Sequence, residues 1–242
     1  MSVRIGQASL GETGGHGQQP GNQTGRELNF STWYPAVWLG VLRFKDPAKA
    51  ELAAKACEAG VKNKNIGYDM DNRNTAYAAA KAVGWDLSKI TKPVETDCSA
   101  FMMLCAISAG VHKLEDLFRR QGNSCTTYCM RHDWPQTGEF ELLAAARYLK
   151  KDEYLLRGDV LVSSGHTVMV LEDGPNAKGE REMRYEKLRD VNNTLYRQTL
   201  DKLIAKGFLT GKSGEGEDMI LDLAEDNVRM LVILDRAGVF GD

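Results

Sequence analysis

The segment from Glu95 to Val111 constrains the fold of this chain more than any other. Its polar start leads into the apolar run Cys-Ser-Ala-Phe-Met-Met-Leu-Cys-Ala-Ile-Ser, and it closes with Gly-Val. Thr96 and Asp97 are residue types that cap helix N-termini, and glycine commonly ends a helix. The segment therefore predicts a helix whose first turn contains Cys98.

Cys98 has the position expected of a nucleophile. Backbone N–H groups lack intrahelical partners at a helix start, and the positive end of the helix dipole stabilises a thiolate. The residues predicted to bury the opposite side of the helix follow at helical spacing: Phe101, Leu104, Cys105 and Ser108. We therefore predict that Cys98 is reactive and that Cys105 is inert.

A cysteine nucleophile needs a base, and His166 has the best setting among the four histidines. It follows a Ser-Ser-Gly turn between two β-branched runs, which predicts a hairpin with the histidine at the start of its second strand. A lone cysteine is more often a buried apolar residue, and a lone histidine is more often a turn residue. A helix-start cysteine followed by a strand-start histidine is, however, the chain order of papain-like cysteine hydrolases.

Short motifs make this resemblance specific. Asp-Cys-Ser at 97–99 resembles the signature of the NlpC-type peptidoglycan peptidases. Gly-Asp-Val at 158–160 and Gly-His at 165–166 resemble that family's Gly-Asp-Leu strand and its histidine strand. The stretch from about Arg4 to Leu171 further resembles phage endolysins of this class. The resemblance implies an α+β, papain-like NlpC/CHAP-type domain, in which a cysteine-bearing helix packs on a small antiparallel sheet that carries the histidine.

The resemblance also implies an activity, namely lysis of bacterial cell walls by hydrolysis of an amide in the peptidoglycan stem. Cys98 would attack the amide carbonyl, and His166 would first accept the thiol proton and later protonate the leaving amine. The resemblance allows an N-acetylmuramoyl-L-alanine amidase or an endopeptidase within the stem. It implies no metal and no other cofactor.

Three residues are candidates for substrate binding. Asp97 and Ser99 flank the nucleophile. Tyr68 matches the tyrosine that many NlpC-type enzymes place near the nucleophile to orient the substrate. The alternative for Tyr68 is a loop tyrosine that packs on the following helix.

The third catalytic group is open between two glutamates. A papain-like site needs a polar side chain that holds the histidine ring in one tautomer. Glu172 lies at an even offset from His166 and would share its strand face. Glu182 lies in a short strand expected at 182–186. We favour Glu172, because its place on the histidine strand is the better defined.

Five cysteines cannot all pair within one chain. Cys125, Cys129 and His132 form a Cys-x₃-Cys-x₂-His cluster, but no fourth ligand accompanies them and zinc sites usually need four. We predict free thiols in a protein made in a reducing cytosol.

Charge and hydropathy restrict the partners. The net charge of −2 gives no electrostatic reason to expect nucleic acid as a partner. The start of the chain lacks an apolar stretch of signal-peptide length, and no run reaches the ~20 apolar residues of a membrane span. We expect a soluble protein, made without a signal peptide in the host bacterial cytoplasm. The resemblance implies that it reaches the wall through holes made by a separate phage protein.

The Gly-rich residues 11–25 would normally indicate a flexible tail. Apolar residues precede them, and strand-like alternation follows them at 27–34. A similar opening, with a Gln-Thr-Gly segment and a Trp-Tyr pair, occurs in the endolysins that the chain resembles. We therefore expect an ordered loop beside the active site.

The pattern changes after Glu172. A Gly- and Pro-containing linker separates a catalytic domain over residues 1–180 from a small helical module over 187–242. Helices are expected at 195–204 and 224–236, and they form too small a core to be very stable alone. The module should therefore contact the catalytic domain, a second copy or a ligand. The resemblance implies cell-wall binding, and self-association through the C-terminal helices is the other option.

Two other functions stay open. The chain could be a non-catalytic cell-wall-binding protein whose thiol is incidental. It could also be a cysteine transferase or deamidase, since related folds act on protein amides.

Overall fold

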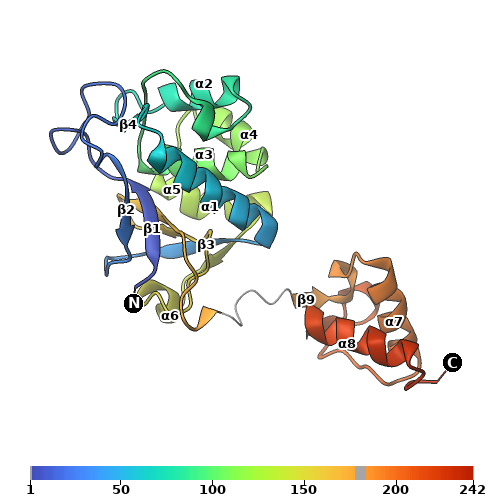
Figure 1. Ribbon diagram of the computed structural model, residues 1–242. Helices are drawn as coiled ribbons and strands as arrows, with labels where there is room; N and C mark the ends of the chain where they lie inside the picture. The colour runs from blue at the N-terminus through green and yellow to red at the C-terminus, as the bar shows by residue number, and fades with distance from the viewer. Residues whose placement is uncertain (1, 178–183, 242) are drawn as a thin grey trace. The chain divides into compact units, whose positions relative to one another are not determined.

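The computed structural model describes residues 2–177 and 184–241. The chain divides into two compact units, Met1–Lys178 and Gly179–Asp242, and each is described by itself (Figure 1). None of the helices in the described ranges has the length and apolarity required to cross a bilayer.

The N-terminal unit is built on a six-stranded, fully antiparallel sheet in the order β2-β1-β8-β7-β3-β6. Its strands are β1 (Arg4–Ala8), β2 (Leu28–Thr32), β3 (Gly40–Phe44), β6 (Phe140–Leu143), β7 (Val160–Val162) and β8 (Thr167–Val170). The first strand of the chain therefore lies beside the last strand of this unit. This pairing brings the N-terminal segment next to the predicted histidine hairpin.

Helices precede and follow a second, parallel pair of strands, β4 (Ile66–Tyr68) and β5 (Val94–Thr96). The helices are α1 (Pro47–Lys62), α2 (Thr75–Ala82), α3 (Cys98–Ser108), α4 (Lys113–Arg120), α5 (Thr127–Asp133) and α6 (Ala146–Leu149). Short 3-10 helices occupy Leu87–Lys89 and Pro135–Thr137. Together with the antiparallel sheet, these elements make the unit a mixed α+β fold.

Helix α3 is the centre of the unit, because every residue from Cys98 to Ile107 is buried. We expected burial of the helix side opposite Cys98, but the helix is buried on all sides. Helix α1 packs against it at Gly60, where an added Cβ would lie 2.5 Å from the ring of Phe101. Helix α1 continues past Gly60 to Lys62. The glycine allows close contact between the two helices.

The sheet is covered on both faces. One face packs with α1 and α3 in a core that includes Leu42, Phe101 and Met169. The other face forms a second core with Ile5, Trp38, Val41, Tyr148 and Val168 among its members. Because successive side chains alternate between faces, Gln7 lies on the same face as Ile5. The ring of His166, which directly precedes β8, contacts Gln7.

The C-terminal unit contains α7 (Thr194–Ala205), α8 (Glu225–Arg236) and an antiparallel pair, β9 (Arg184–Lys187) and β10 (Ile220–Ala224). Short 3-10 helices occupy Leu188–Asp190 and Gly216–Asp218. The helices lie close to the predicted ranges, but the expected purely helical module was incomplete, because two strands contribute. Its own core comprises Tyr185, Leu188, Val191, Tyr196, Leu200, Leu221, Val228 and Val232.

Candidate active site

Cys98 is the first residue of α3, and Asp97 is the cap of the two candidates, Thr96 and Asp97, that the sequence offered. Asp97 is in an extended conformation, and its Oδ1 accepts a hydrogen bond of 2.7 Å from the backbone N–H of Ala100. The Cys98 side chain is 7% exposed. Its thiol donates to the carbonyl oxygen of Gly165, with 4.0 Å between sulfur and oxygen. The helix start and the histidine hairpin therefore meet at this sulfur.

The predicted hairpin is also confirmed, since β7 and β8 pair antiparallel around a tight turn. The backbone N–H of Ser163 donates to His166 O at 2.8 Å, and Ser163 Oγ accepts from the His166 N–H at 2.9 Å. Both bonds fix His166 directly before β8, next to Gly165. Among the described residues, no hydrogen bond joins the Cys98 thiol to the His166 ring. The structure thus brings the two segments together while the ring contacts another residue.

That residue is Gln7 on β1. His166 Nε2 lies 2.9 Å from Gln7 Oε1, and Tyr34 donates its hydroxyl to the same oxygen at 3.2 Å. Gln7 Nε2 in turn donates to Asn29 Oδ1 at 3.1 Å. Sequence reasoning missed Gln7. The available signal was a polar side chain on the face of the strand that also carries the buried Ile5.

The ring of His166 contacts Gln7 and makes no hydrogen bond to Glu172, the favoured glutamate, in the described part of the chain. Strand β8 ends at Val170, so Glu172 lies beyond it and is exposed. Glu172 therefore does not share a strand face with His166, because the strand does not extend to it. Glu182 lies outside the described residues.

The electrostatics of the site follow from burial. Burial and the neighbouring Asp97 carboxylate raise the pKa of Cys98 to about 11, although the backbone N–H groups of Thr167, Ser99 and Cys98 itself favour the thiolate. Burial also lowers the pKa of His166 below its ordinary value. The two groups are therefore a neutral thiol and a neutral imidazole at pH 7. The helix dipole favours a thiolate, but desolvation has the larger effect and keeps the thiol protonated.

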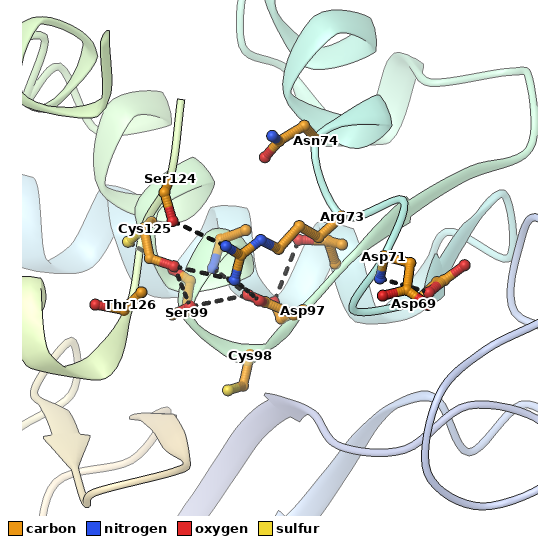
Figure 2. Close-up of polar contacts among 12 residues, drawn as sticks. Asp69, Asp71, Arg73, Asn74, Asp97, Cys98, Ser99, Ser124, Cys125 and Thr126 are labelled. Carbon is orange, nitrogen blue, oxygen red and sulfur yellow. Dashed lines mark hydrogen bonds and ion pairs between the residues drawn. The ribbon is translucent and has the colours of Figure 1, made fainter. Parts of the chain in front are cut away.

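Asp97 and Ser99 belong to a network behind the nucleophile (Figure 2). Asp97 Oδ2 pairs with Arg73 Nη1 at 2.6 Å, and Arg73 Nη2 donates to Ser124 Oγ at 2.8 Å. The Ser99 hydroxyl lies 2.9 Å from Asp97 Oδ1 and 2.8 Å from the carbonyl oxygen of Cys125. Both residues are 3% exposed. The structure places them in internal contacts that fix the start of α3, and the Cys98 side chain points away from this network.

Tyr68 lies close to the nucleophile. It is the last residue of β4 and is buried. Burial, together with the proximity of Cys98 and Asp97, raises the pKa of Tyr68 to about 12. The position that the resemblance implied for Tyr68 is thus compatible with the structure. Its hydroxyl is protonated at neutral pH and can donate.

The Gly-rich loop is ordered, as expected, and two buried glutamates hold it. Glu27 Oε1 accepts from the Gln23 N–H at 2.6 Å, and its Oε2 accepts from the Tyr68 N–H at 3.1 Å. Glu95 Oε1 accepts from the Gly21 N–H at 2.6 Å. A Cβ on Gly67 would lie 2.3 Å from the Gly21 carbonyl, so the loop touches β4 directly. Glu95 lies on β5, which leads to Cys98.

The Gly-Asp motif has a structural role. Asp159 accepts from Arg43 Nε at 2.9 Å and from Arg43 Nη2 at 2.6 Å, and it also accepts from the Leu156 N–H at 2.8 Å. Gly158 has a φ of 95°, and an added Cβ would lie 2.7 Å from Ala50. These contacts hold the start of β7 against β3 and α1.

The cysteine-rich segment does not assemble a metal site within the described ranges, where no group of three or more His, Cys, Asp or Glu side chains could hold an ion. The Cys125 thiol donates to the Ser99 carbonyl oxygen at 3.5 Å. The ring of His132 contacts that of Tyr128 in a tilted arrangement, with 4.2 Å between centroids. All five cysteines are free thiols.

Comparison with known proteins gives one family. A family model described as an endolysin-like domain matches residues 5–177. No curated protein and no solved structure matches the chain. The matched span falls within the N-terminal unit and contains Gln7, Cys98 and His166.

Proposed function

Because the chain belongs to the endolysin-like domain family, which points to a hydrolytic enzyme acting on the bacterial cell wall, we propose that its N-terminal unit is a papain-like cysteine hydrolase. The substrate is an amide bond of the peptidoglycan stem. One observation carries the proposal: the Cys98 thiol donates a hydrogen bond to the carbonyl oxygen of Gly165, the residue directly before His166. The imidazole of His166 is itself in contact with Gln7.

The first step forms an acyl-enzyme. Cys98 Sγ bonds to the amide carbonyl carbon while His166 Nδ1 takes the thiol proton. The Cys98 backbone N–H at the start of α3 stabilises the oxyanion. The C–N bond then breaks, and His166 gives the proton to the leaving amine. The product of this step is a thioester on Cys98.

The second step releases the acyl group. His166 takes a proton from water, the resulting hydroxide attacks the thioester carbonyl, and the C–S bond breaks as Cys98 Sγ is reprotonated. A neutral resting pair suits both steps, because the imidazole begins each of them as a base. The proposal includes both an N-acetylmuramoyl-L-alanine amidase and a stem endopeptidase.

Gln7 is the third group of the proposed site. Its amide orients the imidazole but carries no charge, so it does not stabilise an imidazolium as a carboxylate would. This agrees with a pKa of His166 that lies below its ordinary value. The proposed third residue is therefore Gln7 instead of Glu172 or Glu182.

We further propose that residues 187–242 bind the cell wall, while residues 1–180 carry catalysis. The C-terminal unit has its own core, and no residue of the catalytic unit contributes to that core. Several large apolar side chains on it are more than half exposed: Phe208, Met230, Ile233 and Val239. Exposed apolar side chains are available for contact with a wall ligand, and self-association through the same helices is the competing outcome.

The test is incubation of the full chain with purified walls, followed by mass analysis of the soluble fragments. New amine termini on muropeptides support the proposal and identify the amide that is cut. Cys98→Ser should lower release by about three orders of magnitude, since a serine hydroxyl is a much weaker nucleophile in this site. Cys129→Ser, at the partly exposed cysteine, is the matched control and should retain full activity.

Two outcomes would contradict the proposal. Wall binding without any fragment release, with Cys98→Ser unchanged, would identify a non-catalytic binding protein. Loss of ammonia from protein amides, or transfer of the acyl group to an added amine without release of muropeptides, would identify a deamidase or a transferase.

A further inference from the structure

A continuous polar chain runs outward from the candidate catalytic ring across three adjacent strands. It passes from His166, directly before β8, to Gln7 on β1 and Asn29 on β2, and it ends at the backbone carbonyl of Arg26. Gln7 and Asn29 are directly opposite each other in the β1–β2 register. We propose that Asn29 is a positioning residue, through which the Arg26 carbonyl fixes neutral His166 as its Nε2–H tautomer.

At its Arg26 end, this series of hydrogen bonds has a fixed direction. A backbone carbonyl oxygen only accepts hydrogen bonds. Asn29 lies with its terminal Nδ2 2.5 Å from Arg26 O, and the same nitrogen is 2.9 Å from Ser9 Oγ. The reversed amide would place Asn29 Oδ1 against the Arg26 carbonyl, with two acceptors facing each other. The NH₂ group therefore faces Arg26, and Oδ1 faces β1.

The orientation of Gln7 follows from that of Asn29. Asn29 Oδ1 accepts from Gln7 Nε2 at 3.1 Å, so Gln7 Oε1 must face the opposite way. There it receives the Tyr34 hydroxyl at 3.2 Å. Burial raises the pKa of Tyr34, which keeps this hydroxyl protonated and able to donate. A second donor thus supports the same amide orientation.

The contact between Gln7 and His166 determines the tautomer of the imidazole. Gln7 Oε1 accepts only, and it lies 2.9 Å from His166 Nε2. A neutral imidazole has one N–H, so this contact requires the proton on Nε2 and leaves a lone pair on Nδ1. Under the proposed function, on which the catalytic meaning of this inference rests, Nδ1 is the nitrogen that receives the Cys98 proton. The opposite tautomer would have no base to offer the thiol.

The experiment reads the tautomer directly. Long-range ¹H–¹⁵N NMR of the imidazole nitrogens in the full chain, above the pKa of His166, distinguishes Nε2–H from Nδ1–H. A His166→Gln variant assigns the signal among the four histidines. The native chain should show only Nε2–H. Asn29→Ala frees the Gln7 amide to reverse, so an Nδ1–H population should appear and kcat should fall several-fold with KM unchanged.

Two further variants make the test specific. Ser31→Ala changes a residue on the same strand whose hydroxyl, within the described ranges, bonds only to the Thr32 carbonyl, and it should leave both the tautomer and kcat unchanged. Tyr34→Phe removes one donor but leaves the Asn29 connection, so His166 should stay as Nε2–H.

Three results would overturn the inference. They are an Nδ1–H ring in the native chain, an unchanged tautomer in folded Asn29→Ala, and a shift to Nδ1–H in Tyr34→Phe. The first and third remain decisive if Asn29→Ala does not fold. Because the NMR measurement needs no substrate, it also separates the two proposals. A chain with the expected tautomers but no wall hydrolysis would refute the function and leave the assignment of Asn29 intact.

Discussion

At the scale of single residues, the chemistry of the site depends on how burial shifts two pKa values. Cys98 lies where backbone N–H groups favour a thiolate, yet removal from water raises the pKa of its thiol to about 11. The same removal from water lowers the pKa of His166. Both shifts disfavour charge, so the proposed reaction starts from an uncharged pair.

These shifts predict the pH dependence of hydrolysis. His166 must be neutral to act as a base. Because its pKa is lowered from the ordinary value of 6.5, the imidazole is still mostly neutral at pH 6.5. Activity should therefore be constant between pH 7 and about 9 and fall only as the pH drops through a value below 6.5. A pH profile of kcat/KM on soluble muropeptides measures this. An acid limb centred above pH 6.5 would contradict the neutral pair.

Gln7 provides a second prediction at this scale. Gln7→Ala removes the acceptor that orients the ring and should lower kcat by about 10- to 100-fold. Gln7→Glu keeps an acceptor but adds a negative charge, which favours the imidazolium and should move the acid limb to higher pH. Glu172→Gln is the matched control and should change neither quantity, because Glu172 is exposed beyond β8. An effect of Glu172→Gln as large as that of Gln7→Ala would restore the glutamate as the third group.

At the scale of elements, the Gly-rich loop is held to β4 and β5 by carboxylates that lie close together. Glu95 is 3% exposed, and its Oε2 is buried without a hydrogen-bond partner among the described residues. Burial raises the pKa of Glu95 to about 7, with the neighbouring Glu27, Asp69 and Glu12 contributing in the same direction. The loop beside the site is therefore attached through a group that changes charge near neutral pH.

This predicts a pH-dependent effect of Glu95→Gln on stability. The folded pKa lies above the ordinary value of 4.5, so native Glu95 loses stability as the pH rises from 4.5 through about 7. Glutamine cannot ionise and should stabilise the chain at pH 8, by on the order of 1 kcal/mol, with little effect at pH 4. Thermal unfolding of both proteins at the two pH values measures this. Glu141→Gln, at an exposed position on β6, serves as the control, and an equal effect of Glu95→Gln at both pH values would refute the assignment.

At the scale of the whole molecule, two units with separate cores divide the proposed functions. A core of buried side chains lies on each face of the large sheet, and a third core lies within the C-terminal unit. The family match covers residues 5–177 and therefore concerns the first unit alone. Wall binding by the second unit is a separate proposal with its own test.

That test is truncation. A chain that ends at Lys178 keeps every residue of the candidate site and both cores of the first unit. It should stay soluble and hydrolyse soluble muropeptides at the native rate, but it should lose most binding to intact walls. Sedimentation with purified walls and turnover of soluble substrate measure the two properties. Equal wall binding by both chains would end the targeting proposal, and an insoluble, inactive truncated chain would show that the second unit is structural.

The sequence by itself determined the local features of the site. Asp97 caps α3, Cys98 opens it, and a Ser-Ser-Gly turn places His166 before a strand. Caps and tight turns depend on residues within a few positions of each other, so their patterns could be recognised without the fold. The ordered Gly-rich loop was expected from resemblance, but Glu27 and Glu95, which hold it, were not identified.

Only the tertiary structure decided the rest. Gln7 and His166 are 159 positions apart, and they meet because β1 pairs with β8. The same pairing ends at Val170, which excluded Glu172 from the strand. The raised pKa of Cys98 also depends on the tertiary structure, because the helix dipole acts locally, whereas desolvation depends on everything that packs around the sulfur. Strand pairing and burial are set by contacts between distant segments, and no local pattern of residues specifies them.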